Sequence, residues 1–223
     1  MIDFYSYRTA NGRKVSILLE ECGLDYELHI IDIIARDQDH PAFRAINPNG
    51  RIPAIVDRDG PEGAPLTLFE SGAILIYLAE KAGCFIPKER HGYWTTIQWT
   101  HWQMGAVGPS FGQAFHFLHQ HQPDALENDL SYCRAHYLGE VKRLSGVIDR
   151  RLKLSEYLCG SDYTIADIAT FPWIALHRWL NLELGHTPNL LRWYEAVRHR
   201  PAVRRGMDIP SRQQIADHGG RVW

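Results

Sequence analysis

Two spacings of apolar residues alternate along the first third of the chain. Short strand-like apolar stretches occur at 2–7, 26–33, 52–56 and 66–69. Apolar residues recur at the three- to four-residue spacing of a helix over 11–22 and 71–82, and 41–46 can form a short helix. Gly23 and Gly83 follow the two longer helical stretches, where glycine commonly ends a helix. This order of elements predicts a small mixed sheet with helices on its faces.

The spacing changes near residue 84. The stretch 84–91 contains Pro87 and several charged residues and is typical of a linker. From Tyr93 to Pro201 the pattern is helical throughout, and Thr164 and Thr187 are expected to cap two of the helices. We therefore expect a sheet-containing domain at 1–83, a linker at 84–91, an all-helical domain at 92–202 and a tail at 203–223.

Composition and charge narrow the classes of function. The 223 residues are 45% hydrophobic and 22% charged, as in ordinary globular proteins, and the net charge is −2. That balance gives no electrostatic reason to expect nucleic acid or an anionic membrane as a partner. No apolar run reaches the length of a membrane span, and the four cysteines form no C-x-x-C pair. With no secretory signal at the N-terminus, we expect reduced thiols and a cytoplasmic location.

Two patterns in the helical half could carry chemistry. The stretch 108–112 fits G-x-S-x-G, which in serine hydrolases follows a strand and precedes a helix. Here the preceding residues 93–104 are helical, so we expect a helix break containing a proline instead. His116, His119 and His121 could approach a metal ion, but no carboxylate lies at matching spacing. We expect no metal site.

Polar residues occupy the two turns where a strand gives way to a long helix. Thr9 and Asn11 lie at the first turn, where free backbone N–H groups stabilise an anion and the side chains add donors. At the second turn, Ser71 suits a carboxylate and Glu70 suits an ammonium group, so the pair matches an amino acid. Ordinary helix capping is the alternative explanation at both turns.

The dipeptide Ile52–Pro53 opens a predicted strand. Proline has no N–H, so at a strand start it leaves the backbone of its neighbour available for another partner. The sequence also allows a cis peptide bond here.

Three motifs, in this order, resemble those of the cytosolic glutathione transferases: Asn47-Pro48-Asn49-Gly50-Arg51-Ile52-Pro53-Ala54, Leu68-Phe69-Glu70-Ser71-Gly72-Ala73-Ile74 and Tyr163-Thr164-Ile165-Ala166-Asp167-Ile168-Ala169. The turn 9–12 and the stretch 102–117 resemble more specifically the Nu class, which includes the transferases similar to disulfide-bond oxidoreductases. Members of that class commonly carry proline where this chain has Ala10. The resemblance covers nearly the whole chain. It implies an α/β thioredoxin-like N-terminal domain followed by an all-α C-terminal domain.

The resemblance also implies glutathione as the cosubstrate and a role for each residue of the turns. Glu70 would bind the γ-glutamyl ammonium group and Ser71 the carboxylate beside it. The Ile52 backbone would pair with the cysteinyl backbone, with Pro53 as a structural residue. The glycyl carboxylate would contact two side chains, Gln38 and Arg51. The sulfur would face Thr9 and Asn11, and Tyr5, Ser6 and Tyr7 rank below them because they lie within the strand.

The implied activity is reduction of disulfides by thiol exchange, with peroxide reduction as a related reaction, in a homodimer that needs no metal. The alternatives are a detoxifying transferase that joins glutathione to apolar electrophiles and a non-catalytic glutathione-binding regulatory module. Phe111, Phe115 and His116 are expected to line the second substrate's pocket, although helix packing explains aromatic residues there equally well. No cysteine lies at the strand-to-helix turn, so we expect glutathione's own sulfur to be the nucleophile.

Overall fold

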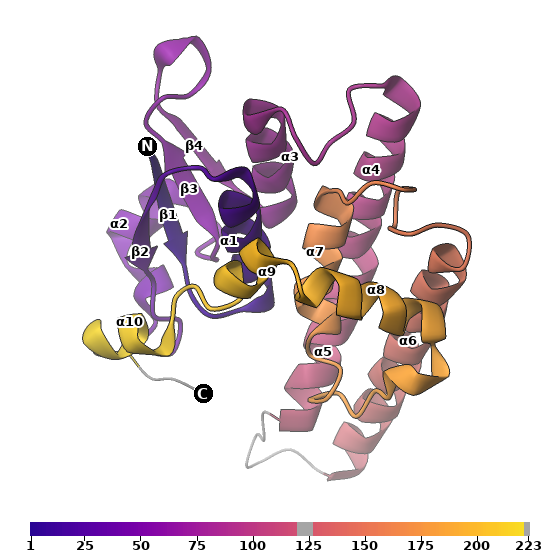
Figure 1. The fold of residues 1–223 in the computed structure, drawn as a ribbon. Coiled ribbons are helices and arrows are strands. Elements are labelled where there is room, and N and C mark those ends of the chain that lie inside the picture. The colour runs from indigo at the N-terminus through magenta and orange to yellow at the C-terminus, as the bar shows by residue number, and fades with distance from the viewer. Residues whose placement is uncertain (120–126, 221–223) are drawn as a thin grey trace. The chain divides into compact units, whose positions relative to one another are not determined.

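The structure is a computed structural model that describes residues 1–119 and 127–220. The chain divides into two compact units (Figure 1). The first comprises Met1–Cys84 together with the chain from His199 onward, and the second comprises Phe85–Arg198.

A mixed sheet forms the centre of the first unit. Its strands are β1 (Ile2–Ser6), β2 (Tyr26–Ile30), β3 (Ala54–Asp57) and β4 (Leu66–Phe69), in the order β2-β1-β3-β4. Strand β1 runs parallel to β2 and antiparallel to β3, and β3 runs antiparallel to β4. This is the thioredoxin-like sheet that was predicted.

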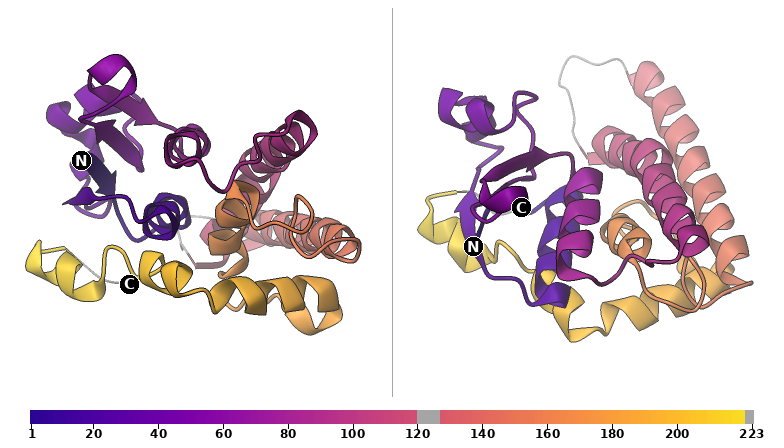
Figure 2. Two further views of the ribbon diagram at one scale, coloured as in Figure 1. Left: turned by 45° about the horizontal axis from the view of Figure 1, so that its top comes forward. Right: turned by 90° about the horizontal axis from the view of Figure 1, so that it is seen from above.

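Helices cover both faces of this sheet. The elements are η1 (Asp37–Asp39), η2 (Pro61–Gly63), α1 (Ala10–Cys22), α2 (Pro41–Ile46), α3 (Ser71–Ala82), α9 (Pro201–Gly206) and α10 (Arg212–Asp217). Helices α1 and α3 pack against each other, as the left view of Figure 2 shows nearly end-on. Helix α2 packs where Phe43 meets Tyr5, and α9 packs on α1, where Ser16 Oγ donates to the Gly206 carbonyl at 2.7 Å.

The register of the ladder places several loops at one end of the sheet. Tyr5 pairs with Ala54, and Ala54 pairs with Phe69. On the other side of β1, Ser6 pairs with Ile30. The chain therefore leaves β1, β2 and β4, and enters β3, at the same end.

Strand β3 begins two residues later than the pattern predicts. The ladder starts at Ala54 because Pro53, which is buried, has no N–H to donate. The Ile52–Pro53 peptide bond is cis.

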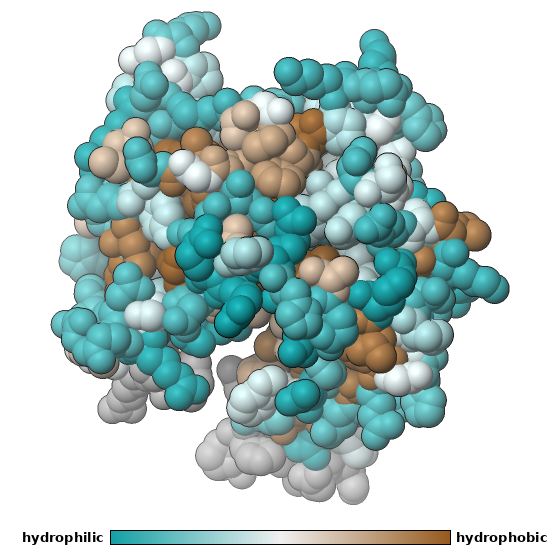
Figure 3. All heavy atoms as spheres, in the orientation of Figure 1, coloured by the Kyte–Doolittle hydropathy of each residue, from teal (hydrophilic) through white to brown (hydrophobic). Residues whose placement is uncertain are grey.

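The second unit is all-α, as predicted. It contains α4 (Arg90–Trp102), the π-turn η3 (Gln103–Val107), α5 (Gly108–His119), α6 (Glu127–Leu152), α7 (Ile165–Ile174), η4 (Leu184–His186) and α8 (Pro188–Arg198). Within residues 1–119 and 127–220, no helix is both long and apolar enough to cross a membrane. The face drawn in Figure 3 is largely hydrophilic, with hydrophobic residues in separate groups.

The predicted helix break at residues 108–112 is wrong. The chain stays helical from Arg90 to His119, and a π-turn at Gln103–Val107 takes up the change of spacing before Pro109. Ser110 therefore lies within a helix, which excludes the strand–turn–helix context of a hydrolase nucleophile. His121 lies outside the described residues.

Asp167 anchors the start of α7. Thr164 and Asp167 form a capping box, and the buried Asp167 carboxylate accepts further hydrogen bonds from Leu158 N at 3.0 Å and Trp193 Nε1 at 2.8 Å. Burial raises the pKa of Asp167 to about 6, while these donors act in the opposite direction. One side chain thus links α7, α8 and the segment before α7.

We predict that Asp167→Ala lowers the free energy of unfolding by roughly 3 kcal/mol, because several buried donors lose their acceptor. Urea unfolding followed by tryptophan fluorescence measures this loss. Lys142→Gln, exposed on α6, is the control and should leave the midpoint unchanged. An Asp167→Ala midpoint equal to that of the wild type would contradict the anchoring role.

Candidate functional site

The start of α1 lies at the end of the sheet where the loops gather. Thr9 is the N-cap, and its Oγ1 accepts a hydrogen bond from Gly12 N at 3.1 Å. The capping role is therefore present, and it leaves the hydroxyl proton to be donated elsewhere. Asn11, in the first turn, is half-buried, and its side chain has no hydrogen-bond partner in the part of the chain that the structure describes.

Close contact between β1 and α1 sets the position of this helix start. A Cβ atom on Gly12 would lie 2.4 Å from Ser6 Oγ and 2.5 Å from the Tyr7 carbonyl oxygen, so only glycine fits. The turn is tightened further by Thr9 N, which donates to the Tyr7 carbonyl at 2.7 Å. The free N–H groups of α1 are therefore held at the end of β1.

The three polar side chains at the end of β1 are packed into the unit. Tyr7 is fully buried, and burial together with the nearby Asp32 carboxylate raises its pKa to about 12. Ser6 is also buried, and its hydroxyl donates to the Tyr7 carbonyl at 3.4 Å. The Tyr5 ring stacks on His29 with 4.5 Å between ring centroids. Tyr7 lies one residue beyond β1 and not within the strand as predicted, and the ranking of the three residues below Thr9 and Asn11 stays a prediction.

The start of α3 has an unusual backbone. Glu70, at the N-cap position, has φ 70° and ψ 110°, and its exposed side chain makes no capping hydrogen bond. A non-glycine residue in this region is strained, by of order 1–3 kcal/mol, and such strain is often found at functional sites. The exposed Glu70 carboxylate therefore makes no capping bond to its own helix and can bind another group.

A buried lysine adds positive charge beside this carboxylate. Lys14 Nζ donates to Ser71 Oγ at 3.4 Å, and both residues are buried. Burial lowers the pKa of Lys14 to about 7, while the Glu70 charge acts to raise it. Because an ammonium group only donates, Ser71 Oγ is the acceptor here and can donate its own proton to a carboxylate. The α3 start thus offers an anionic side chain next to an anion-binding helix end.

Lys14 did not emerge from the sequence as a site residue. A weak signal was present, because it lies one turn before Leu18 on the apolar face of α1. A lysine in an apolar stripe is rarely buried without a partner.

The turn before β3 presents unpaired backbone. Asn47 fixes the turn: its Nδ2 donates to the Arg51 carbonyl at 2.5 Å, and its Oδ1 accepts from Asn49 N at 3.0 Å. Within residues 1–119 and 127–220, Ile52 has no backbone hydrogen bond. Its N–H and C=O can therefore pair with an extended ligand, and the exposed Arg51 side chain lies next to it.

Gln38 lies in the turn η1 (Asp37–Asp39) after β2, and a Cβ atom on Gly50, in the turn before β3, would lie 3.3 Å from its carbonyl oxygen. Its side-chain oxygen is buried without a hydrogen-bond partner among the described residues. The strand register and these turns therefore place two predicted groups of residues at this end. They are the two expected to face the sulfur, Thr9 and Asn11, and the five expected to bind glutathione, Gln38, Arg51, Ile52, Glu70 and Ser71.

The three residues predicted to line a second-substrate pocket all lie on α5 in the helical unit. Phe111 is fully buried, as helix packing would require. Phe115 is half-buried. The centroid of its ring lies 4.8 Å from that of His119 and 6.3 Å from that of Trp179. His116 is also half-buried. Their role in binding a substrate stays a prediction.

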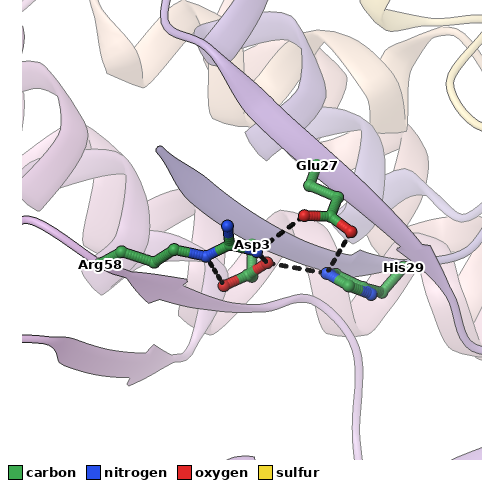
Figure 4. Close-up of polar contacts among 4 residues, drawn as sticks. All are labelled: Asp3, Glu27, His29 and Arg58. Atoms are coloured by element: carbon green, nitrogen blue, oxygen red, sulfur yellow. Dashed lines mark hydrogen bonds and ion pairs between the residues drawn. The ribbon is translucent and has the colours of Figure 1, made fainter.

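A separate cluster has ligand atoms that a metal ion could use. Ligand atoms of Asp3, Glu27 and His29 lie within 4.8 Å of one another (Figure 4). However, Arg58 lies between the two carboxylates, donating to Asp3 at 2.5 and 2.8 Å and to Glu27 at 2.7 Å. The Arg58 guanidinium supplies the positive charge, so the cluster is an ion-pair network that joins β1, β2 and the end of β3.

This network predicts a pH-dependent contribution to stability. Hydrogen bonding to Arg58 lowers the pKa of Asp3 below its ordinary value. The contribution is therefore complete above the unfolded-state pKa, at about pH 4, and is lost as the pH falls through the lower folded-state value. Asp3→Asn should destabilise the protein at pH 7, and the difference from wild type should shrink towards pH 3.

Urea unfolding at a series of pH values tests this, with the exposed Asp25→Asn as the matched control. A difference between Asp3→Asn and wild type that does not change with pH would show that the ion pair with Arg58 is not responsible.

Both halves of the chain match glutathione S-transferase family models. Residues 10–81 match the N-terminal domain and residues 110–201 match the C-terminal domain. The chain is 43% identical over 204 residues to the disulfide-bond oxidoreductase YfcG of Escherichia coli strain K12, a match that covers 91% of this chain and 93% of that protein.

Solved structures of transferases are similar throughout. A glutathione transferase from Burkholderia graminis, with two glutathione molecules bound per subunit, superposes with a TM-score of 0.88 at 45% identity, covering 95% of this chain and 89% of that one. One from Pseudomonas putida, with one glutathione disulfide bound per subunit, gives a TM-score of 0.87 at 40% identity and covers 94% and 92%.

Proposed function

The chain belongs to the glutathione S-transferase family, and on that basis we propose that it binds glutathione and uses the glutathione sulfur to reduce disulfides. The observation that carries the proposal is the start of α3, where the exposed Glu70 carboxylate adjoins Ser71 and Lys14. A carboxylate beside a helix N-terminus, a hydroxyl and a lysine complements the ammonium and carboxylate of a γ-glutamyl group. A purely structural N-cap side chain would bond to its own helix, and the Glu70 side chain does not.

The rest of the tripeptide would extend along the same end of the sheet. The unpaired Ile52 backbone would bond to the cysteinyl backbone, as an added strand does at a sheet edge. Gln38 and Arg51 would hold the glycyl carboxylate. This direction brings the cysteinyl sulfur towards the start of α1, where Thr9 and Asn11 offer donors.

The start of α1 would stabilise the thiolate form of the glutathione sulfur. A free thiol has a pKa of about 8.5, so at pH 7 most of it is protonated. Lowering the pKa by about two units requires roughly 2.7 kcal/mol of preferential stabilisation of the thiolate. One or two hydrogen bonds to the anion, together with the α1 N-terminus, can supply that amount.

The thiolate then acts by exchange. It attacks one sulfur of the substrate disulfide, the S–S bond breaks, and the other sulfur leaves as a thiolate that takes up a proton. A second glutathione attacks the mixed disulfide, giving glutathione disulfide and the second substrate thiol. The names and ligands of the similar proteins, a disulfide-bond oxidoreductase and a transferase with bound glutathione disulfide, support this reaction.

The same thiolate would also serve peroxide reduction or conjugation to an apolar electrophile. Assays with glutathione against hydroxyethyl disulfide, cumene hydroperoxide and an aryl halide rank these activities. Turnover of the aryl halide alone would favour the detoxifying alternative, and no turnover with intact glutathione binding would favour a regulatory module.

We also propose a cytoplasmic homodimer. The four cysteines are free thiols, which suits a reducing compartment. Sedimentation equilibrium tests the dimer directly.

Replacing Glu70 should weaken glutathione binding. Glu70→Ala is expected to cost roughly 2–4 kcal/mol, because the ligand ammonium loses its charged partner, and Glu70→Gln should cost less. Isothermal titration calorimetry measures both affinities. Glu62→Ala is the matched control, since Glu62 is another exposed glutamate with positive φ. Wild-type affinity in folded Glu70→Ala would remove Glu70 from the site.

Thr9 and Asn11 can be tested by the pH dependence of the rate. If both stabilise the thiolate, Thr9→Ala and Asn11→Ala should each move the pH–rate profile to higher pH. If Thr9 only caps α1, Thr9→Ala should cost about 1 kcal/mol of stability and leave the profile in place. An unmoved profile in the double variant would exclude the catalytic role.

A further inference from the structure

Two cysteines that are far apart in the sequence meet at the C-terminal ends of α1 and α3. Cys22 is the last residue of α1, and Cys84 follows the turn that ends α3. Both helices end in a left-handed glycine, and after α3 Cys84 N donates to the Ala79 carbonyl at 3.1 Å. These turns fix the backbone that carries both thiols.

The two sulfur atoms are already close. Cys22 Sγ and Cys84 Sγ lie 3.4 Å apart, both side chains are partly exposed, and both are free thiols. A disulfide bond is about 2.05 Å long, so closing the gap takes about 1.4 Å. Helices α1 and α3, which carry the two thiols, already pack against each other.

The pair is separate from the proposed glutathione site. Helix α1 has 13 residues, so its two ends are about 20 Å apart at 1.5 Å per residue. Thr9 caps one end and Cys22 forms the other.

We propose that Cys22 and Cys84 form a second redox site, an intrachain dithiol that is oxidised by disulfides of the glutathione type. One cysteine thiol loses its proton and attacks a sulfur of glutathione disulfide, whose S–S bond breaks and releases one glutathione thiolate. The other cysteine then attacks the mixed disulfide and releases the second glutathione. The protein loses two electrons and two protons, and glutathione disulfide becomes two glutathione molecules.

The surroundings make this exchange slow at neutral pH. Burial, the neighbouring Cys84 and the charge of Glu21 raise the pKa of Cys22 well above its ordinary value. Both thiols also lie at the negative ends of helices, which disfavour a thiolate. The pair therefore responds to sustained oxidation and not to each turnover.

Oxidation would cross-link the unit around most of its sheet. The bond would join residues 22 and 84, and β2, β3 and β4 all lie between them in the chain. A cross-link over so long a loop restricts the unfolded chain strongly. The oxidised protein should therefore melt roughly 5 to 15 °C higher than the reduced protein.

The test compares the full chain with Cys22→Ser, Cys84→Ser and the matched control Cys133→Ser. Each protein is incubated at pH 8 with glutathione disulfide, the remaining thiols are alkylated, and intact mass, non-reduced peptide maps and melting temperature are measured. Wild type and Cys133→Ser should each lose the mass of two hydrogen atoms and give a disulfide-linked peptide pair that contains residues 22 and 84. Both should also melt at a higher temperature than their reduced forms. Cys22→Ser and Cys84→Ser should stop at one glutathione adduct and show no such rise.

A stable glutathione adduct on wild type without the cross-link would overturn the proposal, as would a wild type that stays fully reduced. So would a Cys84→Ser protein that loses disulfide reductase turnover, because the pair would then belong to catalysis. Glu70→Ala treated with hydroxyethyl disulfide should still form the cross-link. This experiment distinguishes a failure of the cysteine-pair proposal from a failure of the proposed glutathione site.

Discussion

Pairing of β3 with both β1 and β4 is the constraint on which the candidate site depends. Ala54 faces Tyr5 on one side and Phe69 on the other, so the loops beyond these residues must meet at one end of the sheet. A slip of one residue in either ladder would turn every side chain of a strand to the opposite face. It would also shift the starts of α1 and α3 relative to each other. The placement of the loops at this end is therefore set by the backbone hydrogen bonds of the sheet.

Two charged residues at this end of the sheet, Lys14 and Glu70, lower the stability of the protein when no ligand is bound. Lys14 is buried close to the positive end of α3, and Glu70 holds a strained backbone with its carboxylate exposed. Both features cost stability in the absence of a ligand. A ligand with an ammonium group and a carboxylate would offset both, which is why the region fits recognition better than simple capping. The hydrogen bond that Thr9 Oγ1 accepts from Gly12 N, by contrast, is explained by helix capping alone.

Sequence patterns predicted the elements that depend on local interactions. Helix α3 and strand β4 have the predicted bounds because each follows a clear apolar spacing and glycine ends the helix. Strand β3 begins later than predicted because ladder pairing, not hydropathy, decides where a strand starts next to proline. Sequence reasoning missed Lys14 and the Cys22–Cys84 pair because each contacts residues far away in the chain. The place of Lys14 on the apolar face of α1 was only a weak signal, and nothing in the local spacing pairs the two cysteines.

The orientation of α1 explains why a protein with four cysteines would use the sulfur of its ligand. The positive end of the helix dipole lies at Thr9 and Asn11, where a thiolate would be stabilised. The negative end lies at Cys22, where burial and the same dipole keep the thiol protonated. A cysteine at the helix start would be activated permanently, whereas glutathione would bring a reactive sulfur there only when it binds. Cys22, with Cys84 beside it, would then serve as a slow redox pair at the opposite end of the same helix.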